Sequence, residues 1–172
     1  DGGALSISNG QLIVESCILE QGNIKTRAKR GGLIHALETS NVIIKESILK
    51  NARALQGGLI YVGEQSTVHI QNSTLKNATS NRNGGALSVN DLGTKIDIVS
   101  SFIDSCAAMS DETCNYVHHD FGGGALYISE AQATIMLSNI SSNIAMYGGA
   151  IMSHGANIDI KFTAFSSNAA ME

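Results

Sequence analysis

The chain contains no proline and no tryptophan, and aromatic residues make up only 5% of its 172 residues. Without proline, every backbone N–H is able to donate, which suits long ladders of hydrogen-bonded strands. No apolar run approaches the ~20 residues that a membrane helix needs. We therefore expect no membrane insertion by this segment.

The net charge is small, at −4, and favours neither nucleic acid nor an acidic polymer as a partner. Hydrophobic residues make up 43% of the chain, which is enough for a substantial core and argues against disorder. No secretory signal precedes Asp1, and the chain begins inside a repeat and stops at Glu172 without a polar cap. These features predict a segment of a longer protein.

Glycine, in contrast, is abundant, with 18 residues. Twelve of them stand in six pairs, each followed by Ala or Leu and then by Leu or Ile. The pairs are Gly2-Gly3, Gly31-Gly32, Gly57-Gly58, Gly84-Gly85, Gly123-Gly124 and Gly148-Gly149. Self-similarity of this kind predicts one continuous repeat domain, 1–172, with about six coils of ~25–29 residues that start near residues 2, 31, 57, 84, 123 and 148.

Aligned on the first glycine, the repeats carry apolar residues in five shared columns. The first two columns contain Leu5, Ile34, Ile60, Leu87, Leu126, Ile151 and Ile7, Ala36, Val62, Val89, Ile128, Ser153. The next two contain Leu12, Val42, Val68, Ile96, Ala133, Ile158 and Val14, Ile44, Ile70, Ile98, Ile135, Ile160, and the last contains Leu19, Leu49, Leu75, Ile103, Ile140, Phe165. This period-two alternation predicts about three short strands per repeat, and no repeat has the spacing of a helix. We expect an all-β fold, a single-stranded parallel β-helix or β-solenoid.

The glycine pair is expected where one coil bends into its next strand. There a residue needs φ > 0, or the stacked backbones leave no room for a Cβ, and either reason favours glycine. A further column is uniformly small and contains Cys17, Ser47, Ser73, Ser101, Ser138 and Thr163. It predicts a second tight corner with stacked hydroxyls, and a ligand site built from these hydroxyls is the alternative.

The fourth repeat is longer than the others, and its surplus falls in 104–122. Solenoids tolerate insertions as loops that project from one face, often the binding face. One hypothesis is therefore that this loop insertion binds a receptor.

The Gly-Gly-Ala-Leu/Ile signature, together with Ile140-Ser-Ser-Asn143 and Phe165-Ser-Ser-Asn168, resembles the repeats of chlamydial polymorphic outer-membrane proteins. We call the position of Asn143 and Asn168 the Asn column. In the other repeats this column contains Gly22, Ala52, Ala78 and Cys106. The resemblance implies a right-handed, pectin-lyase-like β-helix on a cell surface, used for adhesion or display.

Carbohydrate lyases and hydrolases share that architecture and carry clustered Asp residues on an outward face. The outward column here contains Ile13, Ile43, His69, Asp97, Thr134 and Asp159. At ~4.8 Å per coil, Asp97 and Asp159 would lie roughly 9.6 Å apart, at or beyond the ~6.5–9.5 Å that inverting glycosidases use. Asp97, Asp159 and His69 are therefore weak catalytic candidates, a solvated pair is the favoured interpretation, and we expect no enzyme.

His118, His119 and Asp120 are metal-ligand types, but adjacent residues of an extended segment point to opposite sides. We expect no metal and no cofactor. Cys106 and Cys114 enclose a short loop that a disulfide could close in an extracellular protein, and free or buried thiols are the alternative.

Three Asn-x-Ser/Thr sequences begin at Asn72, Asn77 and Asn139, and they are glycosylation candidates in a secreted eukaryotic protein. Asn77, nearest a coil corner, is the best placed.

Basic residues gather in the first two repeats. They are Lys25, Arg27, Lys29, Arg30 and Arg53. They could hold an acidic partner or polysaccharide, but a solvated loop is the favoured interpretation.

Together these patterns predict a structural or adhesive segment of an extracellular or cell-surface solenoid. Because an uncapped β-helix end is an unpaired sheet edge, the expected partners are further coils of the parent chain or identical copies stacked end to end into a filament. A host or cell-surface receptor and a glycan are further expected partner classes. The alternative is a polysaccharide-cleaving or glycan-binding β-helix that uses the outward Asp/His column.

Overall fold

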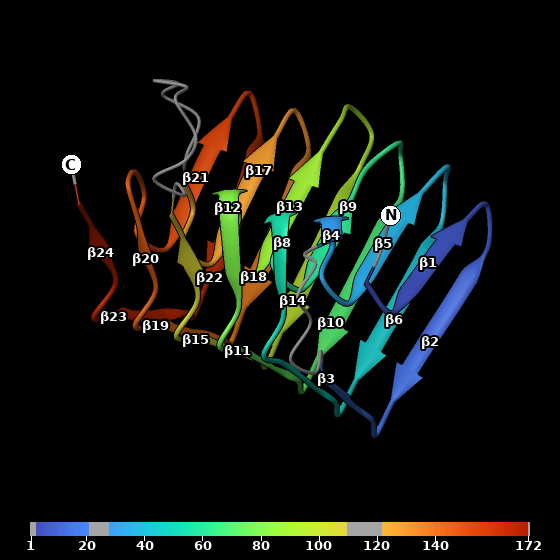
Figure 1. Ribbon diagram of the computed structural model, residues 1–172, viewed down its shortest axis with the longest axis horizontal. Helices are drawn as coiled ribbons and strands as arrows, with labels where there is room; N and C mark the ends of the chain where they lie inside the picture. The colour runs from blue at the N-terminus through green and yellow to red at the C-terminus, as the bar shows by residue number, and fades with distance from the viewer. Residues whose placement is uncertain (1–2, 21–27, 110–121, 172) are drawn as a thin grey trace.

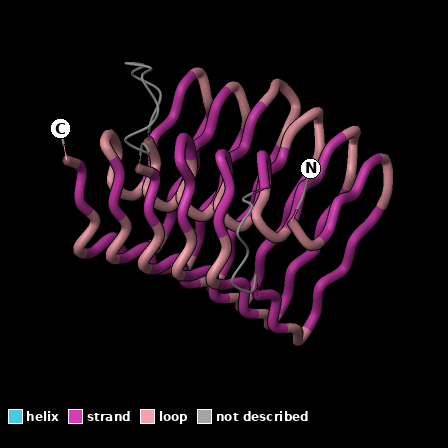
Figure 2. Tube along the Cα trace, viewed as in Figure 1, coloured by secondary structure: helices cyan, strands magenta, loops and turns pink. Residues whose placement is uncertain are grey.

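The computed structural model describes residues 3–20, 28–109 and 122–171. Within these ranges every regular element is a β-strand, and the 24 strands form four six-stranded parallel sheets. Figure 1 shows equivalent strands recurring side by side along the long axis, and Figure 2 shows the same winding along the Cα trace. The prediction of an all-β parallel solenoid is confirmed, with about five turns between the first and sixth strand of each sheet.

Each coil supplies one strand to each sheet, so coil one contains β1–β4, coil two β5–β8, and so on to coil six with β21–β24. Sheet A contains β1 (Leu5–Ser8), β5 (Ile34–Leu37), β9 (Ile60–Val62), β13 (Leu87–Asn90), β17 (Leu126–Ser129) and β21 (Ile151–His154). Sheet B contains β2 (Gln11–Glu15), β6 (Asn41–Lys45), β10 (Thr67–Gln71), β14 (Lys95–Val99), β18 (Gln132–Met136) and β22 (Asn157–Lys161). Sheet C contains β3 (Ile18–Glu20), β7 (Ile48–Lys50), β11 (Thr74–Lys76), β15 (Phe102–Asp104), β19 (Asn139–Ser141) and β23 (Ala164–Ser166). Sheet D contains β4 (Ala28–Arg30), β8 (Arg53–Gln56), β12 (Thr79–Asn83), β16 (Ala107–Ala108), β20 (Ile144–Ala145) and β24 (Ala169–Ala170).

Sheet D corrects the expectation of about three strands per coil, because it is a fourth. Its last three strands have two residues each, so they carry too little sequence for a period-two signal. Pairing still continues through them, as Ala107 faces Ile144 and Ala108 faces Ala145.

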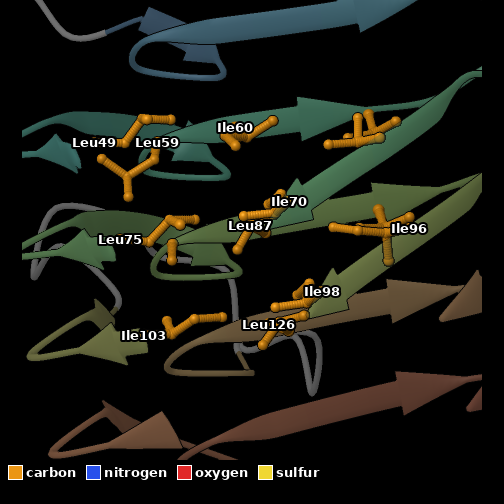
Figure 3. Close-up of a cluster of buried hydrophobic side chains, with 14 of the residues drawn as sticks. Leu49, Leu59, Ile60, Ile70, Leu75, Leu87, Ile96, Ile98, Ile103 and Leu126 are labelled. Atoms are coloured by element: carbon orange, nitrogen blue, oxygen red, sulfur yellow. The ribbon is translucent and has the colours of Figure 1, made fainter. Parts of the chain in front are cut away.

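The five apolar columns stack in the predicted register. Leu5 pairs with Ile34 and Leu19 with Leu49, and the ladders of sheets A, B and C continue in this way to coil six. Inward side chains of the middle coils are fully buried, and Figure 3 shows them layered coil over coil. Burial of each such side chain stabilises the fold by about 1.5–3 kcal/mol, but only where a neighbouring coil covers it.

The five glycine pairs from Gly31-Gly32 onward lie at the corner between sheets D and A, and both expected reasons for glycine hold there. Gly57 has φ +61°, and a Cβ on it would lie 2.1 Å from the carbonyl oxygen of Ile60. Gly58 is different, because its Cβ would lie 2.1 Å from the carbonyl oxygen of Gly85 in the next coil. The first glycine thus serves the turn, and the second allows the coils to stack.

The corner between sheets B and C, called here the B/C corner, also needs a left-handed residue in every coil, but not glycine. The residues there are Ser16, Glu46, Asn72, Ser100, Leu137 and Phe162, with φ between +49° and +52°. None of these side chains is buried, so a Cβ is accommodated at the cost of backbone strain.

Part of the expected insertion, 104–122, belongs to the solenoid. The ladder continues beyond 104 through β16, and the N–H of Met109 donates to the carbonyl oxygen of Ser80 at 3.0 Å. It resumes at Gly122, which bridges to Tyr147. Residues 110–121 lie outside the described ranges.

Candidate functional site

The outward column of sheet B contains the catalytic candidates, and the ladder keeps the two carboxylates apart. Asp97 pairs with Thr134, which pairs with Asp159, so the two Asp residues are two coils apart as predicted. His69 Nδ1 lies 2.9 Å from Asp97 Oδ2, and Lys161 Nζ lies 2.6 Å from Asp159 Oδ2. Each carboxylate therefore has its own basic neighbour on a half-exposed surface. This arrangement does not bring the two together around one substrate bond.

Sheet C carries a carboxylate that the sequence analysis did not single out. Asp104 accepts hydrogen bonds from Ser141 Oγ and Ser105 Oγ, both at 2.7 Å. These bonds lower the pKa of Asp104, the Ser141 bond most strongly. A carboxyl group with a lowered pKa is ionised at neutral pH and is unsuited to donate a proton as a general acid.

Among residues 3–20, 28–109 and 122–171, no three His, Cys, Asp or Glu side chains gather in a way that could hold a metal ion. The candidate ligands His118, His119 and Asp120 lie outside the described residues.

The small column forms a continuous hydrogen-bonded ladder at the B/C corner. The N–H of Ser47 donates to Ser73 Oγ at 3.1 Å, and Ser73 Oγ donates to the carbonyl oxygen of Gln71 at 2.7 Å. The same pattern links Cys17 to Ser47 at 3.1 Å and Ser138 to Thr163 at 3.4 Å. These hydroxyls hydrogen-bond to backbone groups, which agrees with the prediction of stacked corner residues.

A second side-chain ladder, at the corner between sheets C and D (the C/D corner), contains the Asn residues of the Phe-x-x-Asn motif. Asn143 Oδ1 accepts from the N–H of Cys106 at 3.0 Å, and Asn143 Nδ2 donates to the carbonyl oxygen of Ile103 at 3.2 Å. Asn168 Oδ1 in turn accepts from the N–H of Asn143 at 3.1 Å. The recurrence of Asn three residues after the last apolar column was the available signal, but its role needed the stacked coils.

The two cysteines in the described ranges differ in environment. Cys17 is exposed, whereas Cys106 is a buried free thiol that donates to the carbonyl oxygen of Asp104 at 3.2 Å. Burial raises the pKa of Cys106 to about 12. Cys114 lies outside the described residues, and its disulfide with Cys106 stays a prediction.

The three glycosylation candidates also differ in accessibility. Asn72 and Asn77 are exposed at corners, and Asn77 Nδ2 donates to Asn51 Oδ1 at 3.2 Å. Asn139 lies within β19, half-buried, and its Oδ1 is buried without a hydrogen-bond partner. The geometry therefore favours Asn72 and Asn77 as acceptors, and glycosylation itself stays a prediction.

Of the predicted basic residues, Lys25 and Arg27 lie outside the described ranges, and Lys29 is on β4. Arg53 Nε donates to Asn81 Oδ1 at 3.3 Å across sheet D. Arg30 Cζ lies 4.9 Å from the ring centroid of Tyr61, so the guanidinium group makes a cation–π contact with this ring.

His35 lies beside this Arg–Tyr pair, on the outward side of sheet A. Its ring centroid is 5.5 Å from that of Tyr61, and it is only 5% exposed. Burial, with a smaller effect from the charge of Arg30, lowers the pKa of His35. Burial likewise raises the pKa of Tyr61. Both side chains are therefore uncharged at neutral pH, and their rings pack against each other.

On coil six, the side that faces away from coil five exposes apolar side chains. Ile160 and Phe165 are 42% and 44% exposed, whereas their ladder partners Ile135 and Ile140 in coil five are 0% exposed. The difference arises because coil five is covered on both sides and coil six on one.

A scan against protein-family models and a search of curated proteins found no match. The likeness to the chlamydial repeats therefore rests on the sequence motifs, whereas the parallel β-solenoid is observed. In the described residues no helix occurs that is long and apolar enough to cross a membrane.

Proposed function

We propose that this chain is a structural segment of an extracellular or cell-surface β-solenoid, a rod that extends by coil stacking and displays its side faces for adhesion. The observation that carries this proposal is the unbroken register of sheets A, B and C through all six coils. A rod of this kind is stable because each coil interface adds to the total.

The contrast between inner and outer columns supports display. Inner columns contain aliphatic residues except for Ser153 and Phe165 in coil six, whereas the outer column of sheet B changes from Ile43 to His69, Asp97 and Thr134. A scaffold needs a constant interior, and its outer residues can differ without affecting stacking. A receptor or glycan would therefore bind to these outer faces. The extracellular location rests on the motif resemblance.

The proposal is tested by extending the rod. A second copy of 123–172 fused after Glu172 supplies two more coils, which should lengthen the particle by about 10 Å in X-ray scattering and raise its unfolding free energy. As a control, the same fusion carries Ala in place of both glycines of each added pair, which should prevent stacking. An added segment that stays unstructured in the unmodified fusion would refute the proposal.

Two further assays distinguish a display function from a catalytic one. Beads coated with the chain should adhere to cells or to an arrayed glycan. Acidic and neutral polysaccharides incubated with the chain should gain no new ends. New chain ends that disappear in the Asp97→Asn variant would favour the enzymatic alternative.

A further inference from the structure

The chain contains two Asn-Gly steps, Asn9-Gly10 and Asn83-Gly84. Asparagine is one of the chemically labile residues of proteins, because the backbone nitrogen of the next residue can attack its side-chain amide carbon. Glycine favours this attack, since it has no side chain to obstruct the approach and its backbone is flexible. The attack needs an accessible amide group and a backbone N–H that no hydrogen bond holds in place. The fold provides both at only one of the two steps.

Asn9-Gly10 joins β1 to β2 at the corner between sheets A and B, called here the A/B corner (Figure 1). Asn9 and Gly10 are both exposed, and Asn9 has φ +52°. Within residues 3–20, 28–109 and 122–171, the N–H of Gly10 has no hydrogen-bond acceptor. The attacking nitrogen and the amide group are therefore both free to approach each other at this corner.

The exposure of this corner does not depend on coil one being first in the sequence. Glu38 and Glu130 occupy the same corner in coils two and five, which have a neighbour on each side, and both are exposed with φ +54°. The N–H that corresponds to Gly10 in coil two is that of Ser40, and it donates to Ser66 Oγ in the following coil at 3.1 Å. A partner for the N–H of Gly10 would likewise come from coil two, every residue of which the structure describes, and that bond is absent.

At Asn83-Gly84 both conditions fail. Asn83 is only 7% exposed, and the N–H of Gly84 donates to the carbonyl oxygen of Gly122 at 3.0 Å. Gly84 also stands at the corner between sheets D and A, where its φ is +66°. Attack on Asn83 would require this corner to open and the hydrogen bond of Gly84 to break.

Asn72 separates the two conditions, because it meets only one of them. It is exposed, and its φ of +49° is close to that of Asn9. The next backbone N–H, that of Ser73, donates to Ser101 Oγ at 3.1 Å. Asn72 is therefore expected to be stable in the folded chain, although its side chain is accessible.

We propose that Asn9 undergoes spontaneous deamidation in the folded protein, whereas the fold protects Asn83. The backbone nitrogen of Gly10 bonds to Cγ of Asn9 and loses its proton to hydroxide from the solvent. The bond from Cγ to the amide nitrogen breaks, and this nitrogen leaves as ammonia after it takes a proton from water. Water then hydrolyses the cyclic imide at either carbonyl carbon, which leaves aspartate or isoaspartate. The net reaction consumes a water molecule and releases ammonia.

Deamidation would add a carboxylate to a corner that already carries several. In coils two to five the same left-handed position holds Glu38, Glu64, Asp91 and Glu130. Asn9 adjoins Glu38, because the residues that precede them, Ser8 and Leu37, are paired in sheet A. Like charges on neighbouring strands destabilise their pairing, and isoaspartate also lengthens the backbone. Both products should therefore weaken the pairing of coil one with coil two.

The experiment follows the folded chain over time in mildly alkaline buffer, in which hydroxide promotes the attack. Protease digestion and mass spectrometry, with chromatographic separation of aspartate from isoaspartate, report on each asparagine. Asn9 should convert to both products at least about 10-fold faster than Asn83, because breaking the hydrogen bond of Gly84 slows the reaction by about this factor. Asn72 should remain unchanged.

Two controls test the cause of the difference. In urea the rates of Asn9 and Asn83 should become similar, because both are then accessible Asn-Gly steps. In the Gly10→Ala variant the new Cβ would meet no atom closer than 3.7 Å, so the fold is kept, and the methyl group should slow the reaction of Asn9 several-fold. Circular dichroism verifies that the chain is folded at each time point.

If Asn9 stays unchanged in the folded chain, whether or not it reacts in urea, the proposal is overturned. Equal rates for Asn9 and Asn83 in the folded chain would overturn it as well, because burial and the hydrogen bond of Gly84 would then give no protection. A rate at Asn9 that Gly10→Ala leaves unaltered would exclude attack by the backbone nitrogen of residue 10.

Discussion

The backbone N–H of Ser73 donates to Oγ of Ser101, 3.1 Å away in the next coil, and Ser101 Oγ donates to the carbonyl oxygen of Val99 at 2.8 Å. Both serines are buried. One hydroxyl therefore satisfies two backbone groups at a corner where the strand ladder is interrupted. The residues of this corner column are small because the space admits little more than a hydroxyl group. They are polar because both backbone groups need a hydrogen-bond partner.

Ser101→Ala should lower the unfolding free energy by about 1–3 kcal/mol, because it leaves the buried N–H of Ser73 without an acceptor. Urea denaturation measures this change. Ser166→Ala, on the exposed side of sheet C, should have little effect. A Ser101→Ala variant as stable as wild type would contradict the structural role of the ladder.

Gly58→Ala should destabilise the fold by about 1–3 kcal/mol or more, because the new Cβ would lie 2.1 Å from the carbonyl oxygen of Gly85 and would push two coils apart. Gly10→Ala is the matched control, because its Cβ would meet no atom closer than 3.7 Å. Thermal unfolding of the two variants should separate them clearly. Similar melting temperatures would mean that stacking does not require the second glycine.

Stability should fall as the pH drops below about 6.5, in part through His35. Its pKa is lowered from 6.5 by burial, so below that pH the unfolded chain takes up a proton that the folded chain resists. The contribution is fully present above 6.5 and is lost as the pH falls toward the lowered pKa. Unfolding free energies measured from pH 7.5 to 5 should fall less steeply in His35→Phe, which keeps a ring against Tyr61. A His35→Phe variant with the wild-type slope would contradict this role of His35.

Phe162→Asn should leave stability unchanged or raise it by up to about 1 kcal/mol. Phe162 has φ +52° and is 82% exposed, so its side chain gains little from burial while its backbone is strained. Asn tolerates this conformation, as at Asn72 in the same column. Phe165→Asn, three residues away and paired with Ile140 in the ladder of sheet C, should destabilise the fold. The melting temperatures of the two variants test whether Phe162 occupies a strained, exposed corner. A decrease in Phe162→Asn as large as the decrease in Phe165→Asn would contradict this.

Cys106 should resist alkylation in the folded protein, because a thiol with a pKa of about 12 has almost no thiolate at pH 8 and is buried as well. In a Cys114→Ser background, a thiol reagent should label the exposed Cys17 quickly and Cys106 only after unfolding in urea. Mass spectrometry of the labelled peptides distinguishes the two sites. Equal labelling rates in the native state would show that the C/D corner is open.

Much of the solenoid could be predicted because its side chains alternate with a period of two and recur once per coil. Leu19, Leu49 and Leu75 share a column in the sequence, and the ladder pairs them in that order. Sheet D could not be predicted in this way. Strands such as Ala169–Ala170 are too short to alternate, and the neighbouring coil supplies the pairing that makes them strands.

The candidate sites were less predictable than the columns. The separation of Asp97 from Asp159 follows from counting coils, but their partners His69 and Lys161 depend on side-chain positions across a sheet. Among the three glycosylation candidates the sequence favours Asn77, and only the fold shows that Asn72 is exposed as well and that Asn139 is half-buried. The role of Asn143 as an acceptor for Cys106 needs residues 37 positions apart to be adjacent.

The sequence by itself determined the repeat length, the inward columns and the corner that needs glycine, since these arise from local side-chain periodicity and backbone freedom. Tertiary structure decided which glycine lies against the backbone of the next coil and which polar side chains bridge coils. The physical reason is that these properties are contacts between coils, and a contact between residues a full turn apart exists only once the chain has wound.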